Sequence, residues 1–150
     1  MSDPSADPWR LSRFVEAQSD MYERALAELR AGCKRSHWMW FVFPQIAGLG
    51  FSSMSVRHAL AGRAEARAYL AHPVLGPRLR ECADALLALD GGRLATQIFG
   101  HPDDLKLRSS ATLFAQVSPP GSVFHQLLER YFDGRADDAT LALLPNDDAA

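Results

Sequence analysis

The residues best suited to chemistry gather between Lys34 and Trp40, where the sequence reads KRSHWMW. A helix that begins here would direct free backbone N–H groups and a partial positive charge toward one place, which suits an anion. An indole face would suit a nucleic base or another flat ring. At most one tryptophan can face a ligand, because Trp38 and Trp40 lie two positions apart and point to different faces of a helix. In the simpler alternative, both tryptophans are core residues and the cations are solvated.

Two further segments could supply donors to the same ligand. Gly48 and Gly50 form a turn ahead of several serines, and glycines let backbone amides converge on an oxyanion without a β-carbon in the way. Lys106 and Ser110 lie four apart on one helical face with Ser109 beside them, so an ammonium and two hydroxyls could meet one phosphate or carboxylate. The alternatives are a turn that needs glycine only for its geometry and a capped helix with an exposed lysine.

The chemistry of these side chains argues that they share one cleft. An imidazole, an ammonium, hydroxyls and the amide of Gln45 would be costly to bury separately, but together they supply the donors that an anionic ligand requires. We therefore predict that His37 and Lys106 line one pocket for a small anion, such as a nucleotide or an ADP-ribose-like molecule. If the protein is a hydrolase or transferase, His37 is the general acid or base and Lys106 stabilises negative charge.

A second function fits the same residues. In a non-catalytic protein-binding or adaptor module, these polar side chains would fix helix ends and the partner would be a protein. A convergent polar cleft favours the ligand site, whereas dispersal of the polar groups and an exposed apolar patch favour the adaptor.

Several classes of protein are excluded by composition and motif. The 150 residues are 47% hydrophobic and 23% charged with a net charge of -2, which is typical of a globular protein and argues against a binder of double-stranded nucleic acid. Cys33 and Cys82 are far apart, and the histidines show no zinc or protease spacing, so we expect no metal and no cofactor. The longest apolar run, Trp38 to Pro44, is far below the roughly 20 residues of a membrane span. Without an export signal near the start, the sequence predicts a cytoplasmic protein.

The periodicity of apolar residues predicts helices that would position these groups. One amphipathic helix is expected from Leu11 to Ala31, followed by a short element that Ser36 could cap and Pro44 ends, with a buried strand as the competing interpretation. Further helical patterns begin near residues 52, 62, 73, 102, 122 and 137, and the short segment from Leu94 to Phe99 is left without an assigned element. The fold class is therefore all-α, a compact single-domain multi-helix bundle over residues 9–144 with flexible tails at 1–8 and 145–150.

Two expectations about individual residues follow from this pattern. Trp40, Phe41 and Phe43 should be largely buried, because aromatic residues surround the short element on all sides. Lys34 and Arg35 should be exposed in a loop, so replacing either with alanine should leave folding nearly intact.

The chain resembles a mainly bacterial family known as domain of unknown function 1810. The resemblance runs from about Phe14 to Thr140 and is carried by SHWMWFVFPQIAGLG, YLAHPVLGPRL and IFGHPDDLKLRSSATLF. It implies an all-α domain and no assigned activity, and it marks a polar set that matches at Gln18, Tyr22, Lys34, Gln45, Lys106, Ser109, Ser110 and Thr112. The sequence departs from the pattern at Ala59 and Ala111, which are packing changes. Some members carry the label calpastatin, an extended inhibitor unlike a compact domain with an aromatic core.

Overall fold

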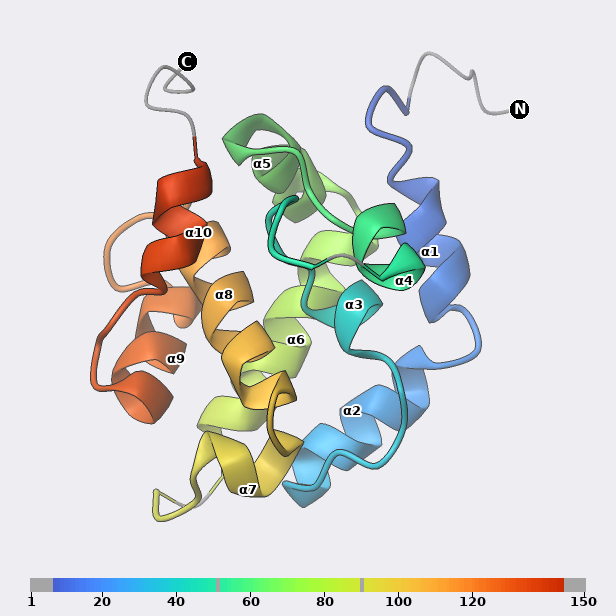
Figure 1. Ribbon diagram of the computed structural model, residues 1–150. Helices are drawn as coiled ribbons and strands as arrows, with labels where there is room; N and C mark the ends of the chain where they lie inside the picture. Colours follow the sequence, from blue (N-terminus) through green and yellow to red (C-terminus); the bar gives the residue numbers. More distant parts are fainter. Residues whose placement is uncertain (1–6, 51, 90, 145–150) are drawn as a thin grey trace.

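Glycine, proline and capping residues divide the chain into ten α-helices within residues 7–50, 52–89 and 91–144, the part that this computed structural model describes (Figure 1). The helices are α1 (Ser12–Gln18), α2 (Tyr22–Ala31), α3 (Met39–Val42), α4 (Ser53–Arg57), α5 (Arg63–Ala71), α6 (Leu75–Leu87), α7 (Ala95–Phe99), α8 (Asp103–Ala115), α9 (Val123–Phe132) and α10 (Asp138–Leu143). No strand occurs in these ranges, and the predicted all-α fold class is confirmed. None of these helices is long and apolar enough to cross a membrane.

Local sequence explains where most of these helices begin and end. The side chains of Ser52, Ser122 and Asp137 each accept a hydrogen bond from the backbone N–H three residues later, which caps α4, α9 and α10. At the other end of α2, Gly32 adopts the left-handed conformation with φ of 73° that a helix-terminating glycine takes readily.

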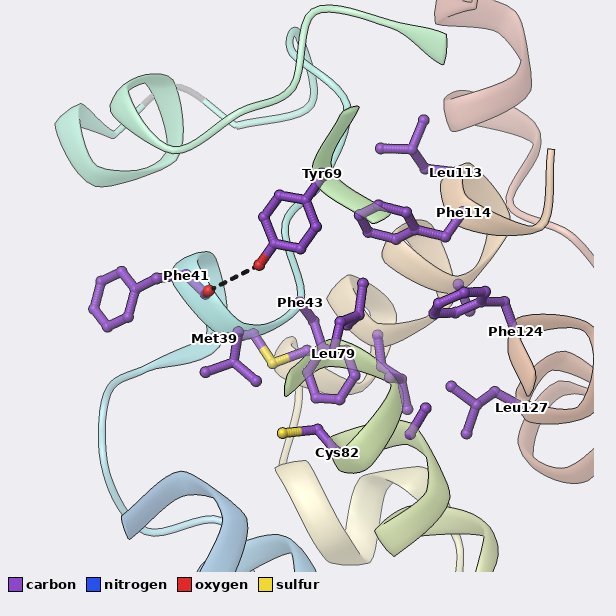
Figure 2. Close-up of a cluster of buried hydrophobic side chains, with 14 of the residues drawn as sticks. Met39, Phe41, Phe43, Tyr69, Leu79, Cys82, Leu113, Phe114, Phe124 and Leu127 are labelled. Atoms are coloured by element: carbon purple, nitrogen blue, oxygen red, sulfur yellow. Dashed lines mark hydrogen bonds between the residues drawn. The ribbon is translucent and has the colours of Figure 1, made fainter. Parts of the chain in front are cut away.

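The core lies between α6 and α8 and the helices around them. Helix α6 contacts α2, α5 and α9, while α8 contacts α5, α7, α9 and α10. Figure 2 shows Phe114 of α8 close to Phe124 of α9, with Tyr69 of α5 on its other side. Because α8 packs against four helices, its middle carries buried small residues that let neighbours approach closely.

The predicted helix from Leu11 to Ala31 is wrong, because the chain breaks between α1 and α2. The hydroxyl of Ser19 donates to the carbonyl of Glu16, a local bond that competes with the helical pattern. Just before the break, the buried amide of Gln18 donates to the carbonyl of Phe41 and contacts the hydroxyl of Tyr69. These tertiary bonds fix the end of α1 in the core.

Helix α3 and the residues beside it pack the aromatic segment from Trp38 to Phe43 against the core. Phe41 and Phe43 are 7% and 2% exposed, as predicted, whereas Trp40 is only half-buried and Trp38 is fully buried. This segment forms a helical turn rather than a strand. Trp38, not Ser36, occupies the N-cap position of α3, and its side chain makes no capping hydrogen bond.

Candidate functional site

A bridge of three charged side chains joins the two sequence segments singled out for chemistry. Asp103 lies in the first turn of α8. Its Oδ2 forms an ion pair with Lys34 Nζ at 2.8 Å, and its Oδ1 forms one with Lys106 Nζ at 3.2 Å. Partial burial works against ionisation of Asp103, but the hydrogen bonds and charges of the two lysines lower its pKa below the usual value. Asp103 therefore bridges the lysines rather than capping α8, and the three groups together carry one net positive charge.

Each lysine of this bridge lies over a tryptophan. Lys34 Nζ is 5.1 Å from the ring centroid of Trp38, and Lys106 Nζ is 4.6 Å from that of Trp40. Trp38 is fully buried, which leaves no face for a ligand. Trp40 is half-buried, and its Nε1 donates to Ser55 Oγ at 3.0 Å.

The side chain of Lys106 lines a pocket with a volume of about 300 Å³. Four of the residues predicted from the sequence meet there, namely Gln45, Gly50, Lys106 and Ser109. The rest of the lining comprises Leu49, Ser55, Pro102, Leu105, Asp137 and Ala139. The segments around α3, α4, α8 and α10 therefore contribute to one concave site.

A short backbone pairing positions the wall that contains Gln45. Its carbonyl accepts the N–H of Leu60 at 2.9 Å, and the Leu60 carbonyl accepts the N–H of Ala47 at 2.8 Å. The turn that follows needs glycine twice. Gly48 has φ of 104°, and a Cβ added to Gly50 would lie 2.6 Å from Ser55 Cβ. The glycines thus allow the turn to close against α4 beside the pocket.

The opposite wall is held by Asp137, the N-cap of α10. Its Oδ2 accepts hydrogen bonds from Ser109 Oγ at 3.0 Å, Thr140 N at 3.1 Å and Thr140 Oγ1 at 2.6 Å. Its backbone N–H donates to Thr112 Oγ1 at 2.8 Å. Thr112 is fully buried, so the structure places it as a support for Asp137 behind the pocket.

Other predicted site residues lie outside this pocket lining. His37 is exposed and is not among the residues that line the pocket around Lys106. Ser110 is 1% exposed, and its hydroxyl has no hydrogen-bond partner among the described residues. Gly48 forms the turn beside the pocket without lining it. No group of three or more His, Cys, Asp or Glu in the described ranges could hold a metal ion.

Glu28 holds the loop that positions Lys34 and Trp38. Its Oε1 accepts Arg35 N at 2.8 Å, Ser36 N at 3.0 Å and Trp38 Nε1 at 2.8 Å, and its Oε2 accepts Ser36 Oγ at 2.7 Å. Partial burial opposes the charge, but these four donors lower the pKa of Glu28 from 4.5 to about 2. The sequence did not reveal this role, because Glu28 lies on α2 as one of many surface acids.

The expectation that Lys34 is an exposed loop cation is wrong. Its side chain is 7% exposed, pairs with Asp103 and donates to the Ser36 carbonyl at 2.7 Å. We expect Lys34→Ala to lower the free energy of unfolding by about 2 kcal/mol, because the partly buried Asp103 loses its closer partner. Arg35→Ala, at the exposed neighbouring position, should change it by less than about 0.5 kcal/mol. Urea denaturation of both variants checks this, and equal stabilities would refute the structural role of Lys34.

Comparison with known proteins gives the chain a family. A family model described as "Protein of unknown function (DUF1810)" matches residues 8–144. The crystal structure of a conserved hypothetical protein from Mycobacterium tuberculosis is similar, with 51% sequence identity and a TM-score of 0.89 over 92% of this chain and 98% of that one. No curated protein matches the chain. The resemblance inferred from the sequence is confirmed, and the chain belongs to the DUF1810 family of proteins of unknown function.

Proposed function

We propose that the pocket beside Lys106 binds a small anionic molecule through a phosphate or carboxylate group. The observation that carries this proposal is the sharing of one carboxylate by two lysines. Lys34 is the closer and more buried partner of Asp103, so the charge of Lys106, whose side chain is 24% exposed, is only partly compensated. An anion bound at the pocket wall would neutralise the remaining positive charge of Lys106.

Gln45 offers a second group to such an anion. Its side chain is half-buried in the lining and makes no hydrogen bond to the described residues, so its amide N–H donors are available. Asp137 is the one carboxylate in the lining, and three donors already converge on its Oδ2. These bonds disperse its charge and reduce its repulsion of a ligand.

The size of the pocket limits the ligand. About 300 Å³ lies at the lower end of the range for small-molecule sites. A phosphorylated or carboxylated metabolite would fit, whereas a nucleotide or an ADP-ribose-like molecule would place one phosphate inside and the remainder outside. Stacking on a tryptophan receives no support here, since Trp38 is buried and Lys106 covers a face of Trp40.

The arrangement supports binding better than hydrolase or transferase chemistry. A general acid or base must lie within hydrogen-bond reach of the reacting group, either directly or through one water. His37 is outside the lining, and the carboxylate of Asp137 is occupied as a helix cap. We therefore propose a binding protein, with no catalytic role for either residue.

Removal of Lys106 tests the ligand site. We expect Lys106→Ala to raise the dissociation constant for inorganic pyrophosphate about tenfold or more in calorimetric titration, since a charge-assisted hydrogen bond contributes about 1.5–3 kcal/mol. Its stability should fall by less than about 1 kcal/mol, because the Lys106–Asp103 pair is partly solvated. Arg35→Ala is the matched cation control. Unchanged affinity in Lys106→Ala would refute the proposed site.

A protein partner is the second candidate function, and exposed leucines favour it. Leu105, in the pocket lining, is 47% exposed, and Leu143 of α10, which lies against Gly48, is 41% exposed. The two candidates respond to different variants. Leu143→Asn, outside the pocket lining, should weaken a protein contact while leaving pyrophosphate affinity nearly unchanged, whereas Lys106→Ala should do the reverse.

A further inference from the structure

A second and larger concave site lies between the segment before α1 and helix α4. Its volume is about 830 Å³, and it shares no lining residue with the pocket beside Lys106. Trp9, Arg10 and Arg13 line it from one side, and Val56 and Arg57 line it from α4. In Figure 1 these two segments lie next to each other, and hydrogen bonds from Arg13 connect them.

Arg13 lines this groove, and all three of its guanidinium nitrogens donate hydrogen bonds. Its Nε donates to the Arg57 carbonyl at 2.8 Å, and its Nη1 donates to the carbonyls of Trp9 at 2.6 Å and Arg10 at 3.0 Å. Its Nη2 donates to the Ala59 carbonyl and to Glu65 Oε2, both at 2.9 Å. Because a single guanidinium binds the carbonyls of both Arg10 and Arg57, the backbones of these two residues are held close together.

The groove carries two positive charges that the described residues do not balance. The guanidinium groups of Arg10 and Arg57 make no hydrogen bond or ion pair to the described part of the chain, and both residues are exposed. Glu65, the carboxylate in the lining, is paired with Arg13 at 2.9 Å and also accepts the N–H of Ala61. On a chain with a net charge of -2, this groove is therefore locally cationic.

An aromatic ring completes the chemistry of the groove. Trp9 is 37% exposed although it is a large apolar residue, and the adjacent Val56 is 64% exposed. An exposed indole offers a stacking surface for a nucleic base, and a guanidinium offers a planar fork that matches a phosphate. An acidic peptide would use the arginines but has no need of the indole, so the combination favours a ligand that has both a flat ring and phosphates.

We infer that this groove binds a nucleoside polyphosphate, with the base on Trp9 and the phosphates on Arg10 and Arg57. The volume of about 830 Å³ is within the range of small-molecule binding sites. This inference stands apart from the function proposed for the pocket beside Lys106, because the residues that carry it are different.

Calorimetric titration of the full chain with adenosine triphosphate tests the inference. We expect binding by the unaltered protein and a loss of about tenfold in affinity for Arg10→Ala and for Arg57→Ala, because each removes a charged phosphate partner. Trp9→Ala should weaken adenosine triphosphate by a similar factor while leaving the affinity for inorganic triphosphate unchanged. Arg24→Ala, which removes an exposed arginine on α2 outside the groove, should have no effect.

Three results would overturn the inference. The first is no binding of adenosine triphosphate at about 1 mM, a concentration that detects even weak complexes. The second is unchanged affinity in Trp9→Ala, which would remove the ring from the site. The third is equal affinity for a hexaglutamate peptide, which would assign the groove to an acidic protein segment. Circular dichroism of each variant distinguishes lost binding from lost folding.

Discussion

Glu28→Ala should lower the free energy of unfolding by about 3 kcal/mol. The substitution removes the acceptor of four hydrogen bonds, and the indole N–H of the fully buried Trp38 loses its only acceptor among the described residues. An unsatisfied buried donor costs about 1–3 kcal/mol, and each bond to a charged group contributes on a similar scale. Urea denaturation measures the loss. A decrease below about 1 kcal/mol would show that Glu28 does not hold the loop.

Glu28→Gln separates charge from geometry at the same position. The amide oxygen can still accept from Trp38 and from the loop N–H groups, so this variant should lose less stability than Glu28→Ala at neutral pH. In the natural protein the pKa of Glu28 falls from 4.5 to about 2 on folding, so its contribution is fully present above pH 4.5. The contribution is lost as the pH falls from 4.5 toward 2, and Glu28→Gln should lack this part of the acid dependence. Glu16→Gln, at an exposed site on α1, is the control.

Gly76→Ala should destabilise the protein by about 2 kcal/mol or more, although alanine is the better helix former. Alanine within a helix is normally favoured over glycine by about 1 kcal/mol. Here α6 packs so closely on α5 that a Cβ at position 76 would lie 2.1 Å from the carbonyl oxygen of Leu70. The backbone must shift to relieve this contact, and such overpacking typically costs about 1–3 kcal/mol.

A second glycine provides the control for this experiment. Gly92 has no atom within 4 Å of the position where a Cβ would be added, so Gly92→Ala should keep its stability within about 0.5 kcal/mol. At this chain length, a loss of 2 kcal/mol lowers the melting temperature by about 4–8 °C. An unchanged or raised melting temperature in Gly76→Ala would contradict the close packing of α5 on α6.

Most helices could be predicted because residues at or next to their ends determine where they begin and end. Ser122, Asp137 and Gly32 act through their own backbone neighbourhood, so their type and position suffice. The break between α1 and α2 could not be predicted in the same way, since apolar and long residues at four-residue intervals continue across it. The break is fixed by Gln18, whose amide bonds to residues of α3 and α5 that are distant in sequence.

The candidate site was predicted in its parts but not in its assembly. The four-residue spacing paired Lys106 with Ser110, but Ser109 lies in the pocket lining with Lys106, whereas Ser110 is buried. The partners of the lysines could not be identified, because nothing local distinguishes Asp103 among 18 acidic residues as the one that meets Lys34. Asp137 did leave a signal, since aspartate is a preferred N-cap residue and a helical pattern follows it.

The larger groove was missed because its two sides come from segments forty or more residues apart in the sequence, which no local pattern joins. Trp9 and Arg10 follow directly on the segment expected to be a loose tail, and Arg57 looks like a solvated cation at a helix end. Only the hydrogen bonds of Arg13 bring these segments together. Sequence patterns report the period of one helix but not which loop a guanidinium will bind.

Residue-resolved NMR during titration with inorganic pyrophosphate tests the central claim, that an anion binds beside Lys106, most directly. The largest shifts should occur at the side-chain amide of Gln45 and the backbone amides of Gly50 and Ser109, and Lys106→Ala should abolish them. Shifts at Arg10 and Arg57 should persist in that variant, because these residues line a separate groove. Absence of shifts at Gln45, Gly50 and Ser109, or their persistence in Lys106→Ala, would contradict anion binding beside Lys106.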